Sequence, residues 1–403
     1  MVSRRILMLA NRFPPETFGG AEQQCLRLSQ ALVRLGHRPH ILTSYGNPET
    51  PPHEMLGDVP ISRLYTPDPP QNGGPAIGST IRYARAVPRW LDSQPPFDII
   101  HCHQAKINAW IGVREAVRRG LTSVVKPGAA GPNFDFFSLE KKKFFYGKYA
   151  ARYVAKHADA VVAISHEMRQ DLIDYGLSEK QRHFIPNGVP IPDWDAAGKA
   201  AIRARIRAEV GLSDSDQMVL FVGRMVTQKN VDTLLKAFAR VPGQAHLVLL
   251  GDGALLDENR ALAAELGIGE RAHFRGRVDN VTEYLAASDL FVLPAIAEGM
   301  SNALLEAMAA GAAPLASRVS GNTDLVRDGE NGWLYGPPRD PEALAAGLAT
   351  ALALPPEALA RVAATAQQEM IDTFSIDAIA ARYDALYDQI CPPSSLSPKE
   401  AAA

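Results

Sequence analysis

The chain has 403 residues, 46% of them hydrophobic, which is enough to bury two cores, so we expect two domains. No apolar run approaches the ~20 residues that a transmembrane helix needs, and the cysteines Cys25, Cys102 and Cys391 lie too far apart to indicate a disulfide framework or a zinc site. The net charge of −2 hides an excess of positive charge in residues 1–190 (24 Lys and Arg, 16 Asp and Glu), so we expect this half to meet an anionic partner.

The first apolar stretch, residues 6–10, follows two arginines as in a signal peptide, but it is too short for the apolar core of one. We interpret it as a buried strand. Together with the unpaired cysteines, this predicts a cytoplasmic protein.

Short apolar runs alternate with longer helical patterns along most of the chain. Continuous rather than alternating apolar runs are typical of strands covered on both faces, as in a parallel sheet. We therefore expect an α/β protein with two Rossmann-like, doubly wound domains in tandem. The strands are expected at residues 6–10, 40–43, 99–103, 123–126, 160–164 and 183–185, and at 218–222, 246–250, 272–274, 290–293, 313–316 and 332–335.

Turn-forming residues indicate where the domains meet. The densest turn signal lies at residues 186–190, so we expect one domain over 1–190 and a second over 191–374. Residues 44–78 are rich in Pro and Gly and are expected to form an irregular excursion. Residues 391–403 are expected to be disordered.

Ligands of doubly wound sheets bind beyond the carboxyl ends of the strands, and two such sheets facing each other would form one cleft. Gly19 and Gly20 lie between the first strand and a long helix, where a phosphate or sugar can approach the backbone; a flexible turn is the alternative. His103 ends a strand and is either a substrate contact or a structural residue. His101 and His103 have no acidic or cysteine companion at ligand spacing, so we expect no metal site there.

A basic and aromatic segment follows, with cations and rings at helical spacing. This pattern fits an anionic membrane surface or a lipid diphosphate acceptor, and it fits a solvated helix face equally well. The cations are Lys141, Lys148, Arg152 and Lys156, and the rings beside them belong to Phe145, Tyr149 and Tyr153.

In the second domain, a cationic loop follows the strand at 218–222. Gly223 permits close approach of a ligand to the backbone. Arg224 and Lys229 can clamp a diphosphate and stabilise the charge that grows on it as it leaves. Two solvated loop cations are the alternative.

Two further strands end in turns that can approach a ligand. Gly251, Asp252 and Gly253 follow one strand, but they lack the third glycine of a dinucleotide-binding fingerprint. Val278 follows another strand and belongs either to a main-chain contact with a nucleobase or to a structural loop.

The most informative stretch runs from Glu298 to Glu306. Glu298 lies in the turn after the strand at 290–293, and Glu306 lies inside the next helix. Because helical side chains lean toward the amino end, both carboxylates can face the same mouth. Two acceptors flanking an anion site at a helix start suit a nucleotide-sugar. The residues between the two carboxylates that are expected to bind it are Gly299, Met300, Ser301 and Asn302.

Taken together, these residues resemble the retaining glycosyltransferases of family 4, which have the GT-B fold. The likeness extends over roughly residues 4–390. Its motifs lie at residues 19–20, 164–168, 185–189, 222–229, 251–253 and 298–311.

The resemblance implies transfer of a hexose-type sugar from a UDP- or GDP-linked donor to a glycan or lipid-linked acceptor, in cell-envelope polysaccharide or glycoconjugate synthesis. It assigns the donor sugar hydroxyls to Glu298, the ribose to Glu306, and the diphosphate to Arg224 and Lys229. It implies no metal or other cofactor, and a front-face displacement in which the leaving diphosphate helps to deprotonate the acceptor. The last helix, expected at 375–390, is implied to return to the amino-terminal domain.

One position departs from the family pattern. Many members have a histidine just after the fifth strand of the first domain, where it contacts the sugar, but the loop 125–135 contains none. Lys126, Asp135 and His103 are therefore the candidates for the sugar or acceptor contact.

Two other functions would use similar features. A nucleotide-sugar epimerase can share the architecture, but it needs acid and base groups at the sugar carbon that the sequence does not reveal. A non-catalytic nucleotide-sugar-binding subunit would keep the same cations and carboxylates. We expect no nucleic-acid partner, and we expect a cytoplasmic location with peripheral contact to the inner face of the cytoplasmic membrane.

Overall fold

The structure is a computed structural model that describes residues 2–17, 19–67, 77–142, 146–213, 215–243 and 245–392. The chain divides into two compact units. Unit 1 consists of Met1–Gly188 together with Ile376–Ala403, and unit 2 is Val189–Ser375. Of the tail that we expected to be disordered, residues 393–403 lie outside the described residues.

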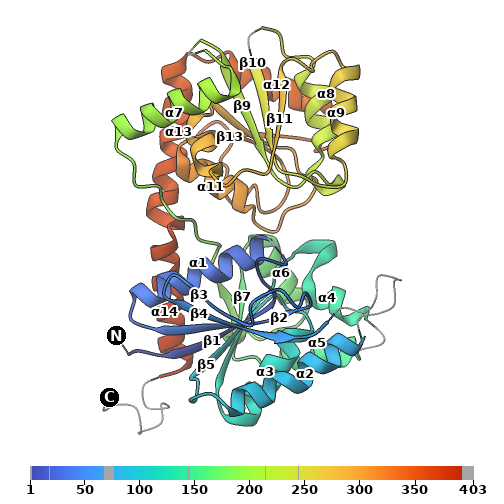
Figure 1. Cartoon of the computed structure of the whole chain (residues 1–403), viewed down its shortest axis with the longest axis vertical. Helices are drawn as coiled ribbons and strands as arrows, with labels where there is room; N and C mark the ends of the chain where they lie inside the picture. Colours follow the sequence, from blue (N-terminus) through green and yellow to red (C-terminus); the bar gives the residue numbers. More distant parts are fainter. Residues whose placement is uncertain are drawn as a thin grey trace. The chain divides into compact units, whose positions relative to one another are not determined.

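Unit 1 is built on a sheet that has eight strands within the described residues (Figure 1). The strand order is β3-β4-β2-β1-β5-β6-β7-β8, and all neighbours pair in parallel except β3, which runs antiparallel to β4. The strands are β1 (Arg5–Arg12), β2 (Arg38–Tyr45), β3 (His53–Leu56), β4 (Val59–Tyr65), β5 (Ile99–His103), β6 (Thr122–Lys126), β7 (Ala160–Ala163) and β8 (Arg182–Phe184).

Helices cover both faces of this sheet, because parallel strands need crossover connections. Figure 1 shows α1 and α14 along one face and α2 and α3 along the other. The helices of unit 1 are α1 (Gly20–Arg34), α2 (Ile77–Asp92), α3 (Ile107–Arg119), α4 (Asp135–Glu140), α5 (Gly147–His157), α6 (His166–Asp174) and α14 (Ile376–Ile390), with short 3-10 turns η1 (Gly131–Asn133) and η3 (Glu179–Gln181).

Side chains on the central strands alternate between the two layers. Ile6 and Met8 pack in one core cluster with α1 and α14. Leu9 and Cys102 face α3, which approaches so closely that a Cβ added at Gly112 would lie 2.4 Å from the Cys102 sulfur. A glycine at this helix position therefore sets how closely α3 packs on the sheet.

Helix α14 fills part of the core of unit 1 although it follows all of unit 2 in the sequence. Arg4, at the start of the chain and fully buried, donates to Asp388 Oδ1 at 2.6 Å. His37 Nε2 is hydrogen-bonded to Asp384 Oδ1 at 3.0 Å. The buried residues of α14 are Ile376, Ile379, Ala380, Tyr383, Leu386 and Tyr387.

The expectation of an irregular excursion over residues 44–78 is wrong for its central part. This region contains a β-hairpin, in which Met55 pairs with Pro60, and β4 extends the main sheet beside β2. Val59 and Ile61 join the unit 1 core. The frequent prolines and glycines obscured the short strands, since both are tolerated at sheet edges and turns.

Unit 2 is built on a parallel sheet with six strands within the described residues, in the order β11-β10-β9-β12-β13-β14. All twelve strands expected from the sequence are present in the two units, with ends that differ by at most two residues. The strands of unit 2 are β9 (Gln217–Val222), β10 (Ala245–Leu250), β11 (Ala272–Gly276), β12 (Leu290–Leu293), β13 (Ala313–Ser317) and β14 (Trp333–Tyr335).

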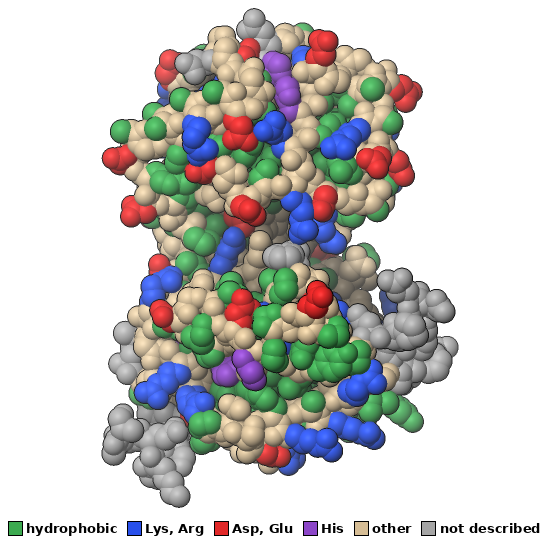
Figure 2. Space-filling view, viewed as in Figure 1, with side chains coloured by type: hydrophobic (Ala, Val, Ile, Leu, Met, Phe, Trp, Pro, Cys, Tyr) green, Lys and Arg blue, Asp and Glu red, His purple; other side chains and the backbone are tan. Residues whose placement is uncertain are grey.

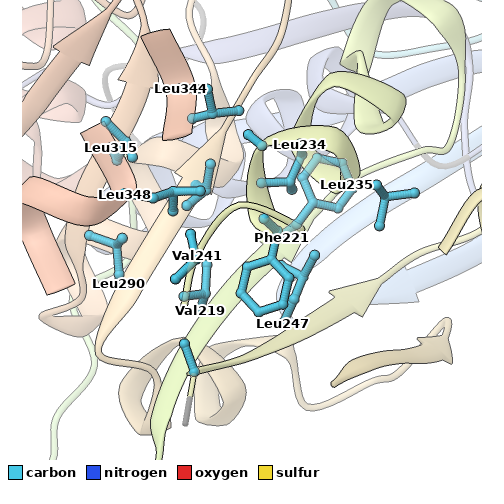
Figure 3. Packing of buried hydrophobic residues seen from close by; sticks show 14 of the residues in the cluster. Val219, Phe221, Leu234, Leu235, Val241, Leu247, Leu290, Leu315, Leu344 and Leu348 are labelled. Atoms are coloured by element: carbon cyan, nitrogen blue, oxygen red, sulfur yellow. The ribbon is translucent and has the colours of Figure 1, made fainter. Parts of the chain in front are cut away.

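One face of this sheet packs against α8 and α12 in a continuous apolar core. Figure 3 shows Val219 and Phe221 of β9 pointing toward Leu234 of α8 and Leu348 of α12, all of them buried. The helices of unit 2 are α7 (Ala196–Val210), α8 (Val231–Phe238), α9 (Leu256–Glu265), α10 (Val281–Ala287), α11 (Asn302–Ala310), α12 (Pro341–Leu352) and α13 (Pro356–Glu369), with a 3-10 turn η4 (Thr227–Lys229) and a π-helical turn η5 (Met370–Phe374).

The chain passes from unit 1 to unit 2 after Gly188 and returns after Ser375. Gln24 of α1 holds the first crossing through both main-chain groups of Gly188, at 2.8 Å to the oxygen and 3.1 Å from the nitrogen. Val189 and Ser375 form an isolated parallel bridge. The two crossings therefore lie side by side.

Within the described residues, no single helix is long and apolar enough to span a bilayer. The pair α12 and Pro356–Phe374 passes the same length and composition test together, but it is bent by 108°. Both members contribute to the unit 2 core through Leu348 and Leu359.

Candidate functional site

The site residues expected in unit 2 follow the carboxyl ends of four neighbouring strands. In the sheet, β11, β10, β9 and β12 lie next to one another and run in parallel. Their carboxyl ends therefore meet at one edge, where ligands of wound sheets bind. The loops after these strands carry the residues described next.

Lys229 and Glu298 form an ion pair at this edge. Lys229 ends η4, which follows β9, and Glu298 lies in the loop after β12. The distance from Lys229 Nζ to Glu298 Oε1 is 2.5 Å, and the two side chains are only 17% and 10% exposed. The cation and the carboxylate that the sequence placed in separate roles are thus in direct contact.

The main chain holds these two loops together on either side of the ion pair. The Ile296 N–H donates to the Gln228 carbonyl at 2.9 Å, and Gln228 Nε2 donates to the Ala297 carbonyl at 2.8 Å. The two loops that carry Lys229 and Glu298 are therefore held together by hydrogen bonds of their neighbours.

Arg224 differs from Lys229 in its surroundings. Its side chain is exposed, and among the described residues its guanidinium has no ion pair. It follows Gly223, whose added Cβ would lie 3.7 Å from the Cδ and Cε atoms of Lys229. The two cations therefore lie on one loop. Arg224 is exposed and can reach an anion, whereas Lys229 is paired with Glu298.

The glycines of this edge serve close packing between the protein's own loops. A Cβ at Gly251 would lie 2.0 Å from the Gly223 carbonyl oxygen, and one at Gly253 would lie 2.5 Å from that of Met225. Both glycines have positive φ angles, of 125° and 148°. Close approach was expected from the sequence, but the partner found here is neighbouring backbone.

Asp252 and Val278 lie at the outer end of the same edge. Asp252 accepts a 2.6 Å hydrogen bond from the Met225 N–H through its main-chain oxygen, so its side chain is not required for that tie. Its carboxylate lies 3.6 Å from the Arg277 guanidinium in an exposed pair. Val278 is half-buried in the loop after β11.

The residues after Glu298 lead into α11 as expected. Ser301 is the N-cap residue, and its hydroxyl accepts from the Leu304 N–H at 3.4 Å. Met300 is buried, and Glu306 is half-buried on the second turn of the helix. The helix start therefore lies directly after the carboxylate loop, with Glu306 on the α-helical face that also carries Asn302.

The loop after β13 packs against the loop that carries Glu298. This support was not predicted from the sequence. A Cβ at Gly321 would lie 2.7 Å from the Gly299 carbonyl oxygen. Ser317 Oγ donates to the Ala295 carbonyl at 2.5 Å, and buried Asn322 Nδ2 donates to the Ser317 carbonyl at 3.0 Å. The Ser-Gly-Asn run at 320–322 is the sequence signal for this support, since such residues favour tight turns.

Asn230 is a second supporting residue that the sequence analysis missed. It is buried and has a left-handed backbone, with φ of 58°. Its Nδ2 atom donates to the carbonyls of Pro294 and Pro338, at 3.0 and 2.8 Å, and its Oδ1 atom accepts from Thr233. One amide thus joins three loops next to Lys229, and asparagine tolerates this backbone better than most residues.

In unit 1, Gly19 and Gly20 lie at the start of α1, as expected. The carboxylate of Glu22 fills the anion position there. It lies so close to Gly19 that a Cβ added to this glycine would be 2.3 Å from Glu22 Oε2. Glu22 is buried. Burial raises the pKa of Glu22, although backbone N–H groups of Glu22 and Gly19 and the charge of Lys106 act in the opposite direction.

His103 ends β5, as expected, but its side chain is buried and not open to a ligand. It is 3% exposed and stacks on His101 with ring centroids 4.6 Å apart. His101 in turn bonds the Tyr387 hydroxyl of α14 through Nδ1 at 2.8 Å. Burial lowers the pKa of His103 well below 6.5, which keeps the imidazole neutral.

Lys126 lies beside His103 at the end of the neighbouring strand, and it is buried. Its ammonium is 5.9 Å from the ring centroid of Tyr383. Within the described residues it has no carboxylate at ion-pair distance. Burial lowers the pKa of Lys126 to about 8.

Asp135, the other candidate for a sugar or acceptor contact, is committed to the protein's own backbone. Its Oδ2 atom accepts from the N–H groups of Ala105 and Gly128, both at 2.8 Å. It is buried, and it ties the loops after β5 and β6 to the start of α4. These contacts give Asp135 a structural role.

The cationic stripe expected over residues 141–156 is divided. Lys148, Arg152 and Lys156 lie on α5, but Lys141 follows α4 and belongs to another segment. Gly147, at the start of α5, lies so close to α4 that a Cβ added there would be 2.0 Å from the Leu139 carbonyl oxygen. Residues eight apart in one helix cannot be this close, so α4 and α5 are separate helices. Phe145 lies outside the described residues.

Among the described residues, no group of three or more His, Cys, Asp and Glu side chains could hold a metal ion. Within the same residues, the three cysteines are free and buried.

Two family models match consecutive parts of the chain. Residues 18–191 match the model described as Glycosyltransferase Family 4, and residues 202–369 match Glycosyl transferases group 1. Together the two matches account for most of both units. The chain belongs to glycosyltransferase family 4.

Individual relatives agree with this assignment. The alpha-maltose-1-phosphate synthase of Mycobacterium tuberculosis is 28% identical over 405 residues, covering 96% of this chain and all of that protein. The lipopolysaccharide core biosynthesis glycosyltransferase LpsE of Rhizobium meliloti is 37% identical over 137 residues, or 34% of this chain and 40% of LpsE. The structure of Anabaena HepE in complex with UDP-glucose has a TM-score of 0.74 at 19% identity, over 96% of this chain and 100% of HepE.

This family 4 member is a retaining glycosyltransferase that transfers a sugar from a nucleotide-sugar. The likeness to HepE and the two parallel-sheet units confirm the expected GT-B fold. In this glycosyltransferase, the residues that the resemblance assigns to the diphosphate, the donor sugar and the ribose lie at one edge of the unit 2 sheet; they are Arg224, Lys229, Glu298 and Glu306.

Proposed function

We propose that this glycosyltransferase takes a hexose from a UDP-linked donor, and that Lys229 and Glu298 form the centre of the donor site. The ion pair between them carries the proposal. It presents a cation and a hydrogen-bond acceptor side by side at the ends of β9 and β12, the two kinds of group that a sugar diphosphate needs. The complex of HepE with UDP-glucose supports uracil as the base.

Lys229 and Arg224 would act on the leaving group. As the bond between the sugar C1 and the diphosphate oxygen breaks, negative charge grows on the diphosphate, and a fixed cation stabilises it most where it is already in place. The acceptor oxygen bonds to C1 on the same face, and its proton passes to the departing phosphate oxygen. No protein nucleophile is required.

Glu298 and Glu306 would hold the two sugar rings of the donor. Glu298 accepts hydrogen bonds from hydroxyls of the transferred hexose while it keeps Lys229 in position. Glu306, on the second turn of α11, accepts from the ribose hydroxyls. The backbone between them, at the start of α11, favours the negative charge of the diphosphate.

For the acceptor, we propose a glycan or a lipid-linked glycan of the cell envelope. The similarity to LpsE, which is named for lipopolysaccharide core biosynthesis, supports an envelope role. The excess of positive charge in residues 1–190 supports an acceptor that carries phosphate or another anion.

The donor assignment is tested by thermal shift with matched pairs of UDP- and GDP-hexoses, for the wild type and for Lys229→Ala. We expect stabilisation by one UDP-hexose, and a much smaller shift in the variant. Stabilisation by GDP-sugars alone would overturn the choice of base. Equal shifts in both proteins would remove Lys229 from the donor site.

A further inference from the structure

The exposed face of α5 carries two parallel rows of side chains, one of rings and one of cations. Lys148, Arg152 and Lys156 lie four residues apart and are exposed. One position further along the helix, Tyr149 and Tyr153 have ring centroids 6.1 Å apart, and those of Tyr153 and His157 are 4.4 Å apart. Residues at this spacing share a helix face.

The opposite face of α5 is apolar and packs into unit 1. Ala150, Ala151 and Val154 are all buried. The helix is therefore fixed to the unit on one side and presents rings and cations on the other. Of its three cations, only Arg152 has a carboxylate nearby among the described residues, Glu140 at 3.6 Å.

A surface cavity of about 380 Å³ opens at the amino end of this face. Its walls are aromatic, and the cation of Arg114 lies 4.8 Å from the ring centroid of Trp110. The indole N–H of Trp110 is shielded from water and has no hydrogen-bond partner among the described residues. The lining residues are Trp110, Tyr146, Tyr149 and Ala150.

Two of the rings that line the cavity are exposed. Tyr146 has a left-handed conformation, with φ of 48°, and the next residue, Gly147, packs against the Leu139 carbonyl. Tyr146 is 80% exposed, and Tyr149 is 60% exposed. Large exposed apolar side chains that gather in one place mark a surface that meets a partner.

We propose that α5 and the aromatic cavity dock unit 1 on an anionic membrane surface. Tyrosine and tryptophan are the side chains that settle at the boundary between lipid and water, since each has an apolar body and a polar end. Lysines and arginines in a row beside them attract anionic headgroups. A headgroup oxygen in the cavity would supply the acceptor that the Trp110 N–H lacks.

The row of cations favours a membrane over a soluble neutral glycan, which needs rings but no positive charge. Figure 2 shows further Lys and Arg side chains gathered along the lower edge of unit 1, where Figure 1 places α2 and α3. Arg82, Arg85 and Arg89 of α2 are exposed. They supply a matched control for general charge attraction.

The test is co-sedimentation with phosphatidylcholine vesicles, with and without phosphatidylglycerol, at low and high salt. We expect the wild type to bind only the anionic vesicles, and less at high salt. In the triple variant K148Q/R152Q/K156Q, the affinity for anionic vesicles should fall on the order of a hundredfold, because each lost charge weakens binding about fivefold. The control variant R82Q/R85Q/R89Q removes the same charge and should lose much less.

The rings are tested separately with Tyr146→Ser and Tyr149→Ser together, compared with Tyr65→Ser, another exposed tyrosine of unit 1. The double variant should bind anionic vesicles at least tenfold more weakly, and Tyr65→Ser should bind as the wild type does. Unchanged thermal unfolding of each variant shows that the fold is kept. Equal loss in the α5 and α2 charge variants, or tight binding of a soluble anionic polysaccharide with no binding to vesicles, would overturn the proposal.

Discussion

Lys229 donates to Glu298 between the ends of two adjacent strands, with Nζ and Oε1 2.5 Å apart. From the sequence, these residues were expected to contact different parts of the donor, Lys229 the diphosphate and Glu298 the sugar. Their contact makes them one unit, in which each charge orients the other. Removal of either one leaves a partly buried charge without its partner.

The first prediction concerns this coupling. Lys229→Ala and Glu298→Ala should each lower kcat/KM for sugar transfer by about 10²–10³-fold, as the loss of a preorganised electrostatic contact does. The double variant should be little worse than either single variant, because residues that act as a unit are not additive. Steady-state kinetics on all four proteins measures this. Additive losses would show that the two residues act independently.

Glu306→Ala provides the contrast. If Glu306 holds the ribose, its contact is present in both the ground state and the transition state, so KM for the donor should rise while kcat changes little. A loss confined to kcat would contradict this role.

The second prediction concerns metal removal. If Lys229 and Arg224 supply the positive charge at the diphosphate, as we propose, transfer should continue in excess EDTA at close to its initial rate. Initial rates before and after chelation measure this. A loss of activity that Mg²⁺ or Mn²⁺ restores would rule the two cations out as sufficient.

The third prediction concerns Asn230. Asn230→Ala removes the hydrogen bonds to the Pro294 and Pro338 carbonyls and the one from Thr233. It also leaves a left-handed backbone on a residue that tolerates it less well than asparagine, so the free energy of unfolding should fall by about 3 kcal/mol. Asn230→Gly loses the same hydrogen bonds but relieves the backbone, and should recover about 1 kcal/mol. Urea denaturation compares the two. Equal stability of both variants would place the whole effect in the side-chain contacts.

The fourth prediction separates a structural Asp135 from one that contacts substrate. Asp135→Ala leaves two N–H groups unsatisfied and should cost about 2–4 kcal/mol. Asp135→Asn keeps an acceptor oxygen. Burial raises the pKa of Asp135, so the stability it contributes is greatest below the unfolded pKa and is lost as pH rises through the folded pKa. At neutral pH the Asn variant should therefore be nearly as stable as the wild type and should keep its activity, which kinetics can check.

The fifth prediction concerns Lys126. Burial lowers its pKa from 10.5 to about 8, so the folded state resists protonation, and stability falls as pH is lowered from 10.5 to 8. Lys126→Met should therefore be more stable than the wild type at pH 7, on the order of 3 kcal/mol, and the difference should vanish above pH 10.5. A difference that does not change with pH would show that folding does not shift the pKa of Lys126.

The framework of both sheets could be predicted because it depends on local patterns. Continuous apolar runs such as residues 218–222 and 290–293 identify buried strands without any knowledge of their partners. The hairpin of β3 and β4 was missed because its strands are short and interrupted by Pro and Gly.

The positions of the predicted site residues could be foreseen where one loop determines them, but not where distant segments do. Lys229 and Glu298 follow strand ends, and they lie at the same edge because the strands are neighbours. His103 stacks on His101, which in turn contacts Tyr383 and Tyr387, two residues from a segment much later in the sequence. Asn230 could be recognised only once the carbonyls that it bonds had been placed.

The position of α14 in the core of unit 1 sets an order for biosynthesis. Unit 2 is one continuous stretch, so every residue it needs has been made once Ser375 is added. Unit 1 must wait for Tyr383 and Tyr387, since its core lacks them until the last helix is made. The half of the protein that the ribosome starts first is therefore the half that can finish folding only after the other is complete.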